Sequence, residues 1–290
     1  MQEVASSNPA PDMTNSRSSR GALVALLVSV SLALAGLGVI AAVPSAAADT
    51  GDAAGAGAAA LLPDVILRPI TEIRIEKHVG VKLLRFASII GNGGAGVVEL
   101  TPDSPSRSAG NDCDGDGDPL NDRKAFQRIF GDTDGDGVFT RGTDQLLSKR
   151  FAGCSLFHAE HDHWHFEEFA RYRLVEPKTG RVVASSEKVS FCVRDSIRFD
   201  DELPGSPGSI YYGACTQDSI TGLSVGWADY YGSTLPGQEL DIRGLPDGRY
   251  CLRTEADPTD RLRESNETNN GRSTLVRITG REVADLGTTC

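Results

Sequence analysis

The sequence predicts a mostly β protein with an antiparallel β-sandwich-like domain. Three observations lead to this prediction. Apolar and polar residues alternate with a period of two in segments such as 72–76, as they do in a half-buried strand. Turn residues such as those of 246–248 separate the segments at short intervals. Strand-like segments do not alternate with amphipathic helices, which disfavours a parallel α/β fold.

Length and composition limit the class of protein. The 290-residue chain is long enough for one large domain or two ordinary ones. Hydrophobic residues make up 39% and charged residues 24%, which excludes a wholly disordered protein and a multi-span membrane protein. The net charge is -11, from 29 Lys and Arg against 40 Asp and Glu. Because phosphate binding needs a basic surface, no nucleic-acid partner is expected.

Residues 1–48 have the order of a secretory signal. Two arginines precede an apolar run over 21–43, and small residues that suit cleavage follow it. The run is also long enough for a membrane helix, so a membrane anchor is the alternative. We expect cleavage, a secreted protein and no stable membrane insertion afterwards. Residues 49–60, mostly alanine and glycine, are expected to form a flexible linker.

The strands of the predicted domain, residues 61–290, fall in two groups on either side of an acidic segment, 101–150, which is interpreted as an insert. The first group comprises 65–67, 72–76, 82–86 with 89–90, and 96–100. The second group comprises 170–174, 182–184, 188–193, 248–252 and 273–278.

The acidic segment contains the first half of a calcium-binding loop. Asp132, Asp134 and Asp136 stand at positions 1, 3 and 5, and a glycine stands at position 6. Position 12 is Thr143, so the usual closing glutamate is missing. Crowded carboxylates repel one another without a cation, and we therefore predict a structural calcium ion. The alternative is a solvated hairpin turn between 126–130 and 138–139.

Four of the five histidines of the chain lie between positions 158 and 165. Alternate residues of a strand point to the same face, so His161, His163 and His165 are expected to present three imidazoles on one side. Imidazole suits copper, zinc, iron and nickel, and the spacing does not choose among them. A polar strand face without a metal is the less favoured alternative, because the histidines are so strongly concentrated.

At this segment the sequence resembles the lysyl oxidase family. The resemblance rests on motifs that occur in the same order as in the family. Residues 161–165 match its His-x-His-x-His copper site, 188–192 match its Lys-x-Ser-Phe-Cys segment, and 229–232 match its Asp-x-Tyr-Gly segment. The similarity covers roughly 61–280. Further matches lie at 168–172, 216–226 and 258–270.

The resemblance implies a secreted, copper-dependent amine oxidase. His161, His163 and His165 would hold Cu(II), and Lys188 and Tyr231 would form the lysine tyrosylquinone cofactor. Such an enzyme oxidises primary amines, peptidyl-lysine or related compounds, to aldehydes, and releases ammonia and hydrogen peroxide. Side chains alone cannot carry electrons from an amine to dioxygen, which is why an organic cofactor is needed.

Asp229 is the predicted base that removes the α-proton of the substrate. It lies two residues before Tyr231, on the same face if the segment is extended. A histidine considered for this role in the family corresponds to Arg171 here. His158 and Glu167 are therefore alternative bases.

All six cysteines follow the predicted leader, and an even number in an exported chain indicates disulfides. Against the lysyl oxidase pattern, Cys192 and Cys215 match two family cysteines, while the usual partner positions are Ser196 and Glu160 here. We therefore expect Cys192 to pair with Cys215. The other expected pairs are Cys113 with Cys154 and Cys251 with Cys290.

Two other functions stay open. A cupin-like metal dioxygenase is one, because His161, His163 and Glu167 imitate part of its motif, although its glycines and second histidine are absent. The other is a non-catalytic extracellular β module that binds copper or zinc, and calcium. A quinone that absorbs visible light separates the amine oxidase from both. The sequence does not choose among lysine-bearing proteins, peptides and small diamines as substrates.

Overall fold

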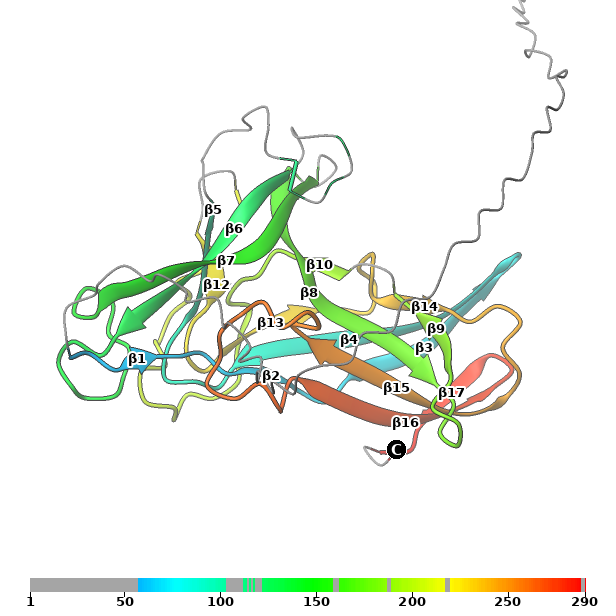
Figure 1. Cartoon of the computed structure of the whole chain (residues 1–290). Coiled ribbons are helices and arrows are strands. Elements are labelled where there is room, and N and C mark those ends of the chain that lie inside the picture. Colours follow the sequence, from blue (N-terminus) through cyan, green and yellow to red (C-terminus); the bar gives the residue numbers. More distant parts are fainter. Residues whose placement is uncertain are drawn as a thin grey trace, which may run out of the picture. The chain divides into compact units, whose positions relative to one another are not determined.

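Antiparallel strands and the turns between them make up the described chain (Figure 1). The computed structural model describes residues 57–102, 112–113, 115, 117, 122–158, 162–186, 189–216, 220–287 and 290. No helix occurs among these residues, and none of them forms a span long and apolar enough to cross a membrane as a helix. All pairings between their named strands are antiparallel. The predicted mostly β class is confirmed.

The larger sheet has eleven strands in the order β12-β5-β6-β7-β8-β15-β16-β17, with β1 paired to β6, and β9 and β10 paired to β8. Its first strands are β1 (Ala60–Leu61), β5 (Val98–Pro102), β6 (Asp122–Gly131), β7 (Gln145–His158), β8 (His163–Val175) and β9 (Val182–Ser185). The others are β10 (Val189–Phe191), β12 (Thr221–Leu223), β15 (Gly248–Ala256), β16 (Gly271–Thr279) and β17 (Glu282–Asp285).

The smaller sheet has six strands in the order β11-β13-β4-β14, with β2 and β3 also paired to β4. The long β4 is therefore its centre. Its strands are β2 (Val65–Leu67), β3 (Thr71–His78), β4 (Val81–Asn92), β11 (Ile197–Arg198), β13 (Trp227–Tyr231) and β14 (Glu239–Asp241).

One hydrophobic cluster joins the two sheets into a sandwich. Phe86 of the smaller sheet is fully buried and meets Tyr172 of the larger sheet, with ring centroids 4.8 Å apart in an edge-to-face arrangement. Along β8, Tyr172 and Leu174 are buried, whereas Arg171 and Arg173 are partly exposed. This alternation is the period-two pattern on which the β prediction rested.

The interpretation of residues 101–150 as an insert is not confirmed. Within the part that the structure describes, β6 and β7 form a hairpin in the middle of the larger sheet, where β6 pairs with β5 and β7 pairs with β8 (Figure 1). The register of the β6–β7 pair shifts at two places. Such bulges interrupt the period-two pattern, which is why the sequence did not predict these strands.

The alternative interpretation of the aspartate loop, a hairpin turn that joins 126–130 to 138–139, names the wrong second strand. Residues 126–130 do belong to β6, but 138–139 are not in a strand, and β6 pairs instead with β7, which begins at Gln145. The connecting loop is therefore longer than a tight hairpin turn. The predicted leader, residues 1–48, lies outside the described residues.

Three disulfides join the cysteines in the expected pairs. Cys113 pairs with Cys154, Cys192 with Cys215, and Cys251 with Cys290, with Cα–Cα distances of 5.7, 5.6 and 5.9 Å. Each closes a loop of 23 to 41 residues. A disulfide of this kind typically stabilises a folded domain by about 2–4 kcal/mol.

Candidate metal and catalytic centre

The hairpin between β7 and β8 brings histidines together. His158 ends β7 and lies opposite His163, which begins β8. The Nε2 atoms of His163 and His165 are 2.9 Å apart, and the rings of His158 and His165 have centroids 4.1 Å apart. Ser190 lies between two of the rings, because its Oγ is 3.3 Å from Nδ1 of His165 and 3.4 Å from Nε2 of His158. Several imidazole nitrogens therefore share one small region.

Trp164 fixes the orientation of the histidine strand. It lies between His163 and His165 in the sequence, is 2% exposed and faces the opposite side of β8. Its ring packs against Phe157 at 5.5 Å, and the guanidinium of Arg123 lies over it at 3.9 Å. Because the large indole is buried, the two histidines that flank it must point to the other face.

The histidines line a cleft with a volume of about 740 Å³. One part of the cleft is lined by Ser190, Cys192 and Arg194, and another part is lined by side chains of β13. The segment 235–238 closes a further side. The cleft therefore combines candidate metal ligands with titratable and aromatic groups from strands that are far apart in the sequence.

Tyr231 ends β13 and faces this cleft. Its hydroxyl oxygen accepts a hydrogen bond of 2.7 Å from the backbone N–H of Cys192. Its ring contacts Phe191 in an edge-to-face arrangement with centroids 4.0 Å apart. Burial raises the pKa of Tyr231 well above its ordinary value, and the nearby charge of Asp229 raises it further. The phenol is therefore neutral at physiological pH.

Asp229 lies on the same strand, two residues before Tyr231, and is 1% exposed. Ser196 Oγ donates a hydrogen bond of 2.9 Å to its Oδ1, whereas its buried Oδ2 has no hydrogen-bond partner among the described residues. Burial raises the pKa of Asp229 to about 8, against the opposing effect of the Ser196 hydrogen bond. The cleft therefore contains a carboxyl group that is protonated at neutral pH and loses its proton in mildly alkaline solution.

Two of the sequence-predicted site residues, His161 and Lys188, lie outside the described residues. The structure brings together the others that were assigned to the copper, the cofactor and the base: His163, His165, Tyr231 and Asp229 all line the cleft. Ser190 and Cys192 line it as well. Their chemical roles stay predictions.

The structure distinguishes between the two alternative bases. His158 lines the cleft, but Glu167 and Arg171 are not among the described residues that do. Arg171 is instead engaged on the sheet, where it donates a hydrogen bond of 2.9 Å to the carbonyl of Pro258 and lies 3.7 Å from Glu255.

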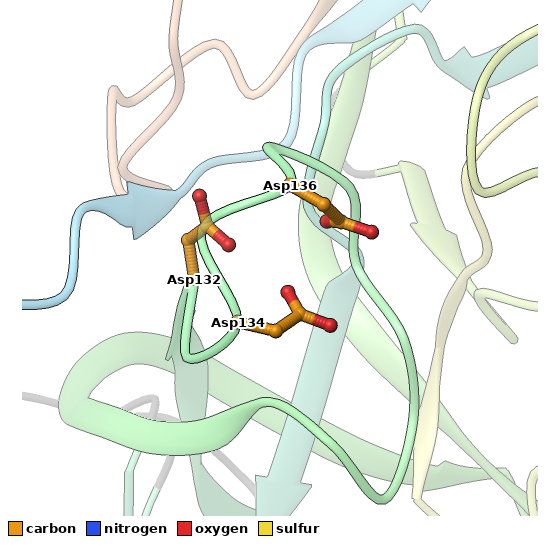
Figure 2. A group of neighbouring side chains, drawn as sticks. All are labelled: Asp132, Asp134 and Asp136. Carbon is orange, nitrogen blue, oxygen red and sulfur yellow. The ribbon is translucent and has the colours of Figure 1, made fainter.

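The three aspartates of the predicted calcium loop lie together on the connection between β6 and β7 (Figure 2). Asp132, Asp134 and Asp136 each offer a carboxylate oxygen, and these oxygens lie within 4.8 Å of one another. Asp132 accepts hydrogen bonds from the amides of Gly135 and Gly137, at 2.8 and 3.0 Å. The loop is therefore already folded around its first aspartate.

Asp144 closes this loop from the position after the expected closing ligand. It is 5% exposed, and its two oxygens accept hydrogen bonds from the amides of Thr133 and Thr140, at 2.8 and 2.7 Å. The Asp144 carboxylate thus holds the two ends of the loop together through backbone amides, at the place where a calcium loop usually has its closing glutamate.

A second group of carboxylates escaped the sequence analysis. Asp257, Glu264 and Glu267 have oxygens within 4.8 Å of one another. Burial raises the pKa of Glu264 to about 8, although the amide of Val65 and the side chain of Asn270 donate hydrogen bonds to it. The three residues come from a turn region without a regular spacing, so no sequence pattern signalled their proximity.

Comparison with known proteins identifies the family. The lysyl oxidase family model matches residues 135–287, which is more than half of the chain. Human lysyl oxidase homolog 1 is 33% identical over 148 residues, and human protein-lysine 6-oxidase is 33% identical over 158 residues. These alignments cover 51% and 52% of this chain, but the chain spans only 24% and 35% of the two relatives. The matched region contains the histidine hairpin and the cleft, and the chain belongs to the lysyl oxidase family, a family of oxidoreductases.

Proposed function

We propose that this protein is a secreted copper-dependent amine oxidase that converts primary amines, peptidyl-lysine or related compounds, to aldehydes with release of ammonia and hydrogen peroxide. The observation that carries this proposal is that His163, His165, Tyr231 and Asp229 all line one cleft. The name of a similar human protein, protein-lysine 6-oxidase, supports lysine side chains as the substrate class. Dioxygen is the proposed oxidant.

The histidine cluster fits a copper ion. Imidazole is a ligand that suits copper, and the Nε2 atoms of His163 and His165 lie 2.9 Å apart, so both would be available to one ion. We propose that His161, His163 and His165 hold Cu(II), which supplies one-electron chemistry with dioxygen when bound. Ser190 lies within hydrogen-bonding distance of His165 Nδ1 and can fix the orientation of that ring.

Lys188 and Tyr231 are the proposed precursors of lysine tyrosylquinone, which supplies the electron sink that amine oxidation needs. Tyr231 fits this role, because its ring borders the cleft and its hydroxyl is held by the amide of Cys192. Cys192 follows β10 (Val189–Phe191) in the larger sheet and Tyr231 ends β13 in the smaller sheet, so the proposed link would join chain segments of the two sheets. Cys192 is in turn anchored by its disulfide with Cys215.

Asp229 is the proposed base. Its position two residues before Tyr231 on an extended strand places both side chains at the cleft. Its carboxyl group lines the cleft and is the proposed acceptor of the proton from substrate. The raised pKa of about 8 makes the carboxylate a stronger base than an exposed aspartate.

Two further parts of the proposal concern the exported state. We propose that Asp132, Asp134 and Asp136 bind a structural Ca²⁺, which would offset the repulsion among their carboxylates. We also propose that residues 1–48 are removed on export. The three disulfides support this, since such bonds persist in oxidising compartments.

The proposal is tested by hydrogen peroxide release from the purified, copper-loaded protein with a lysine-containing peptide and a small diamine. Wild type should release peroxide only when an amine is present, and Tyr231→Phe should reduce this to background because the ring can no longer be converted. Tyr211→Phe is the matched control, since Tyr211 is half exposed and is not among the residues lining the cleft. Full peroxide release by Tyr231→Phe would refute the cofactor assignment.

A further inference from the structure

The segment 232–238 follows Tyr231 directly and forms one wall of the cleft. Its residues from Leu235 to Gln238 line the cleft, and β14 begins immediately afterwards. Tyr231 is the last residue of β13, so nothing in the regular strand fixes the chain beyond it. The orientation of the Tyr231 ring and the shape of this wall therefore depend on contacts that hold the turn.

Glu72 makes the contacts that hold both sides of this turn. The hydroxyl of Tyr230 donates a hydrogen bond to Oε1 of Glu72. The amide and the hydroxyl of Ser233 both donate to Oε2, at 3.1 and 2.8 Å. One carboxylate thus joins the residue immediately before Tyr231 to the residue two positions after it.

The backbone at Glu72 is strained. Its φ of 53° lies in the left-handed region that favours glycine, and the β3–β4 register shifts between Thr71 and Arg74. Bulges of this kind redirect a side chain, and strained residues persist where the surrounding structure holds them in place. The irregularity places the carboxylate where Tyr230 and Ser233 can reach it.

Arginines of neighbouring strands hold the same turn. Arg74 donates from Nε to Ser233 Oγ at 3.3 Å and from an Nη atom to the Ser233 carbonyl at 3.0 Å. Arg85 donates to the same carbonyl at 3.3 Å. At the other end of the segment, the buried side chain of Gln238 accepts a hydrogen bond of 3.0 Å from Ser88. The wall is therefore fixed at its beginning and at its end.

We propose that Glu72 is a positioning residue, which holds the turn around Tyr231 through Tyr230 and Ser233 and thereby sets the orientation of the Tyr231 ring and the adjoining wall of the cleft. Glu72 does not itself line the cleft, so it acts through these neighbours. The catalytic consequence rests on the proposed amine oxidase function, whereas the effect on the turn does not.

The turn is tested by hydrogen–deuterium exchange of peptides covering residues 230–238 in wild type, Glu72→Gln and Glu72→Ala. Glu72→Ala should exchange at least about tenfold faster, the change expected from losing hydrogen bonds to a charged group. Glu72→Gln keeps one carbonyl acceptor and should show a smaller increase. Peptides of β15 (Gly248–Ala256) should be unchanged, which distinguishes a local effect from general destabilisation.

The catalytic effect is tested by kcat and KM for amine-dependent peroxide release. Glu72→Ala should lower kcat about tenfold, with a smaller change in KM and partial rescue in Glu72→Gln, because the Tyr231 ring is misplaced while the cleft stays open. Glu176→Gln is the matched control, since this carboxylate also accepts hydrogen bonds from a hydroxyl and an arginine but lies on the β8–β9 turn. It should retain wild-type kcat and exchange.

The outcomes separate this inference from the proposed function. Wild-type exchange and wild-type kcat in Glu72→Ala would overturn the positioning role. Faster exchange of residues 230–238 with wild-type kcat would also overturn it, because the turn would then be irrelevant to Tyr231. A wild-type protein that releases no peroxide with amines contradicts the proposed function alone, and the exchange comparison still decides whether Glu72 holds the turn.

Discussion

The burial of Asp229 determines the pH range in which its carboxyl group can act as a base. The side chain is 1% exposed, and burial disfavours the charged form, which raises the pKa to about 8. The hydrogen bond from Ser196 stabilises the charged form and opposes this shift. A base must be deprotonated to accept a proton, so the activity that it supports should increase as pH rises through its pKa.

We therefore expect kcat/KM for amine oxidation to rise by about tenfold per pH unit below pH 8 and then to level off. Ser196→Ala should shift this rise to higher pH, because the carboxylate loses a stabilising hydrogen bond. Asp229→Asn should remove most of the activity. Rate profiles of the three proteins check these expectations, and a pH-independent wild type, or a Ser196→Ala profile that coincides with it, argues against Asp229 as the base.

At the residue scale, spacing was the informative signal. The period of two predicted His163 and His165 on one face, and Asp229 and Tyr231 line one cleft together with Tyr230 between them. Contacts across elements were not predictable in this way. Glu72 contacts Ser233, which is 161 positions away in the sequence, and a glutamate in a sequence does not indicate a positive φ. His158 joined the cluster through the hairpin pairing.

At the element scale, the composition of the acidic segment 101–150 concealed the strands β6 and β7. β6 and β7 contain many charged residues, and their bulged pairing interrupts the alternation. One such charge is paired across strands, since the fully buried Glu99 of β5 meets Arg128 of β6 at 2.8 Å, and Glu99 also meets Arg141 of the β6–β7 loop at 2.7 Å. A single sequence does not reveal such partners, so these strands were taken for an insert.

The loop between β6 and β7 provides a prediction at this scale. Removing calcium with a chelator should lower the melting temperature by about 5–10 °C, because an ion at about 100 times its dissociation constant stabilises the fold by about 2.7 kcal/mol. Asp134→Asn should abolish the response, since it removes a proposed ligand that belongs to the cluster of Figure 2. Asp241→Asn, at an exposed aspartate paired with Arg243, should keep it.

Calorimetry of the three proteins with calcium and with chelator makes this comparison. Coincident melting curves for wild type under both conditions would leave the aspartates as a solvated loop that Asp144 closes through the backbone amides. A response that survives in Asp134→Asn would place the ion elsewhere.

At the scale of the whole molecule, the fold class, the disulfide pairs and the family were predictable, and each is confirmed. The fold class followed from alternation and turns, which are local properties. The family followed from motifs in a fixed order, and the Cys192–Cys215 pair followed from positions where the chain departs from the family pattern. The histidine hairpin and β13 belong to different sheets and line the same cleft. In the sequence, only the order of the family motifs indicated that they come together.

The proposed cofactor joins Lys188 to Tyr231 next to a copper-binding histidine cluster. Peptide mass spectrometry of exported, copper-loaded protein detects this bond. We expect a cross-linked pair of peptides that contains both positions and that disappears in Tyr231→Phe. Separate, unmodified peptides carrying Lys188 and Tyr231 in protein that releases peroxide with amines would contradict it.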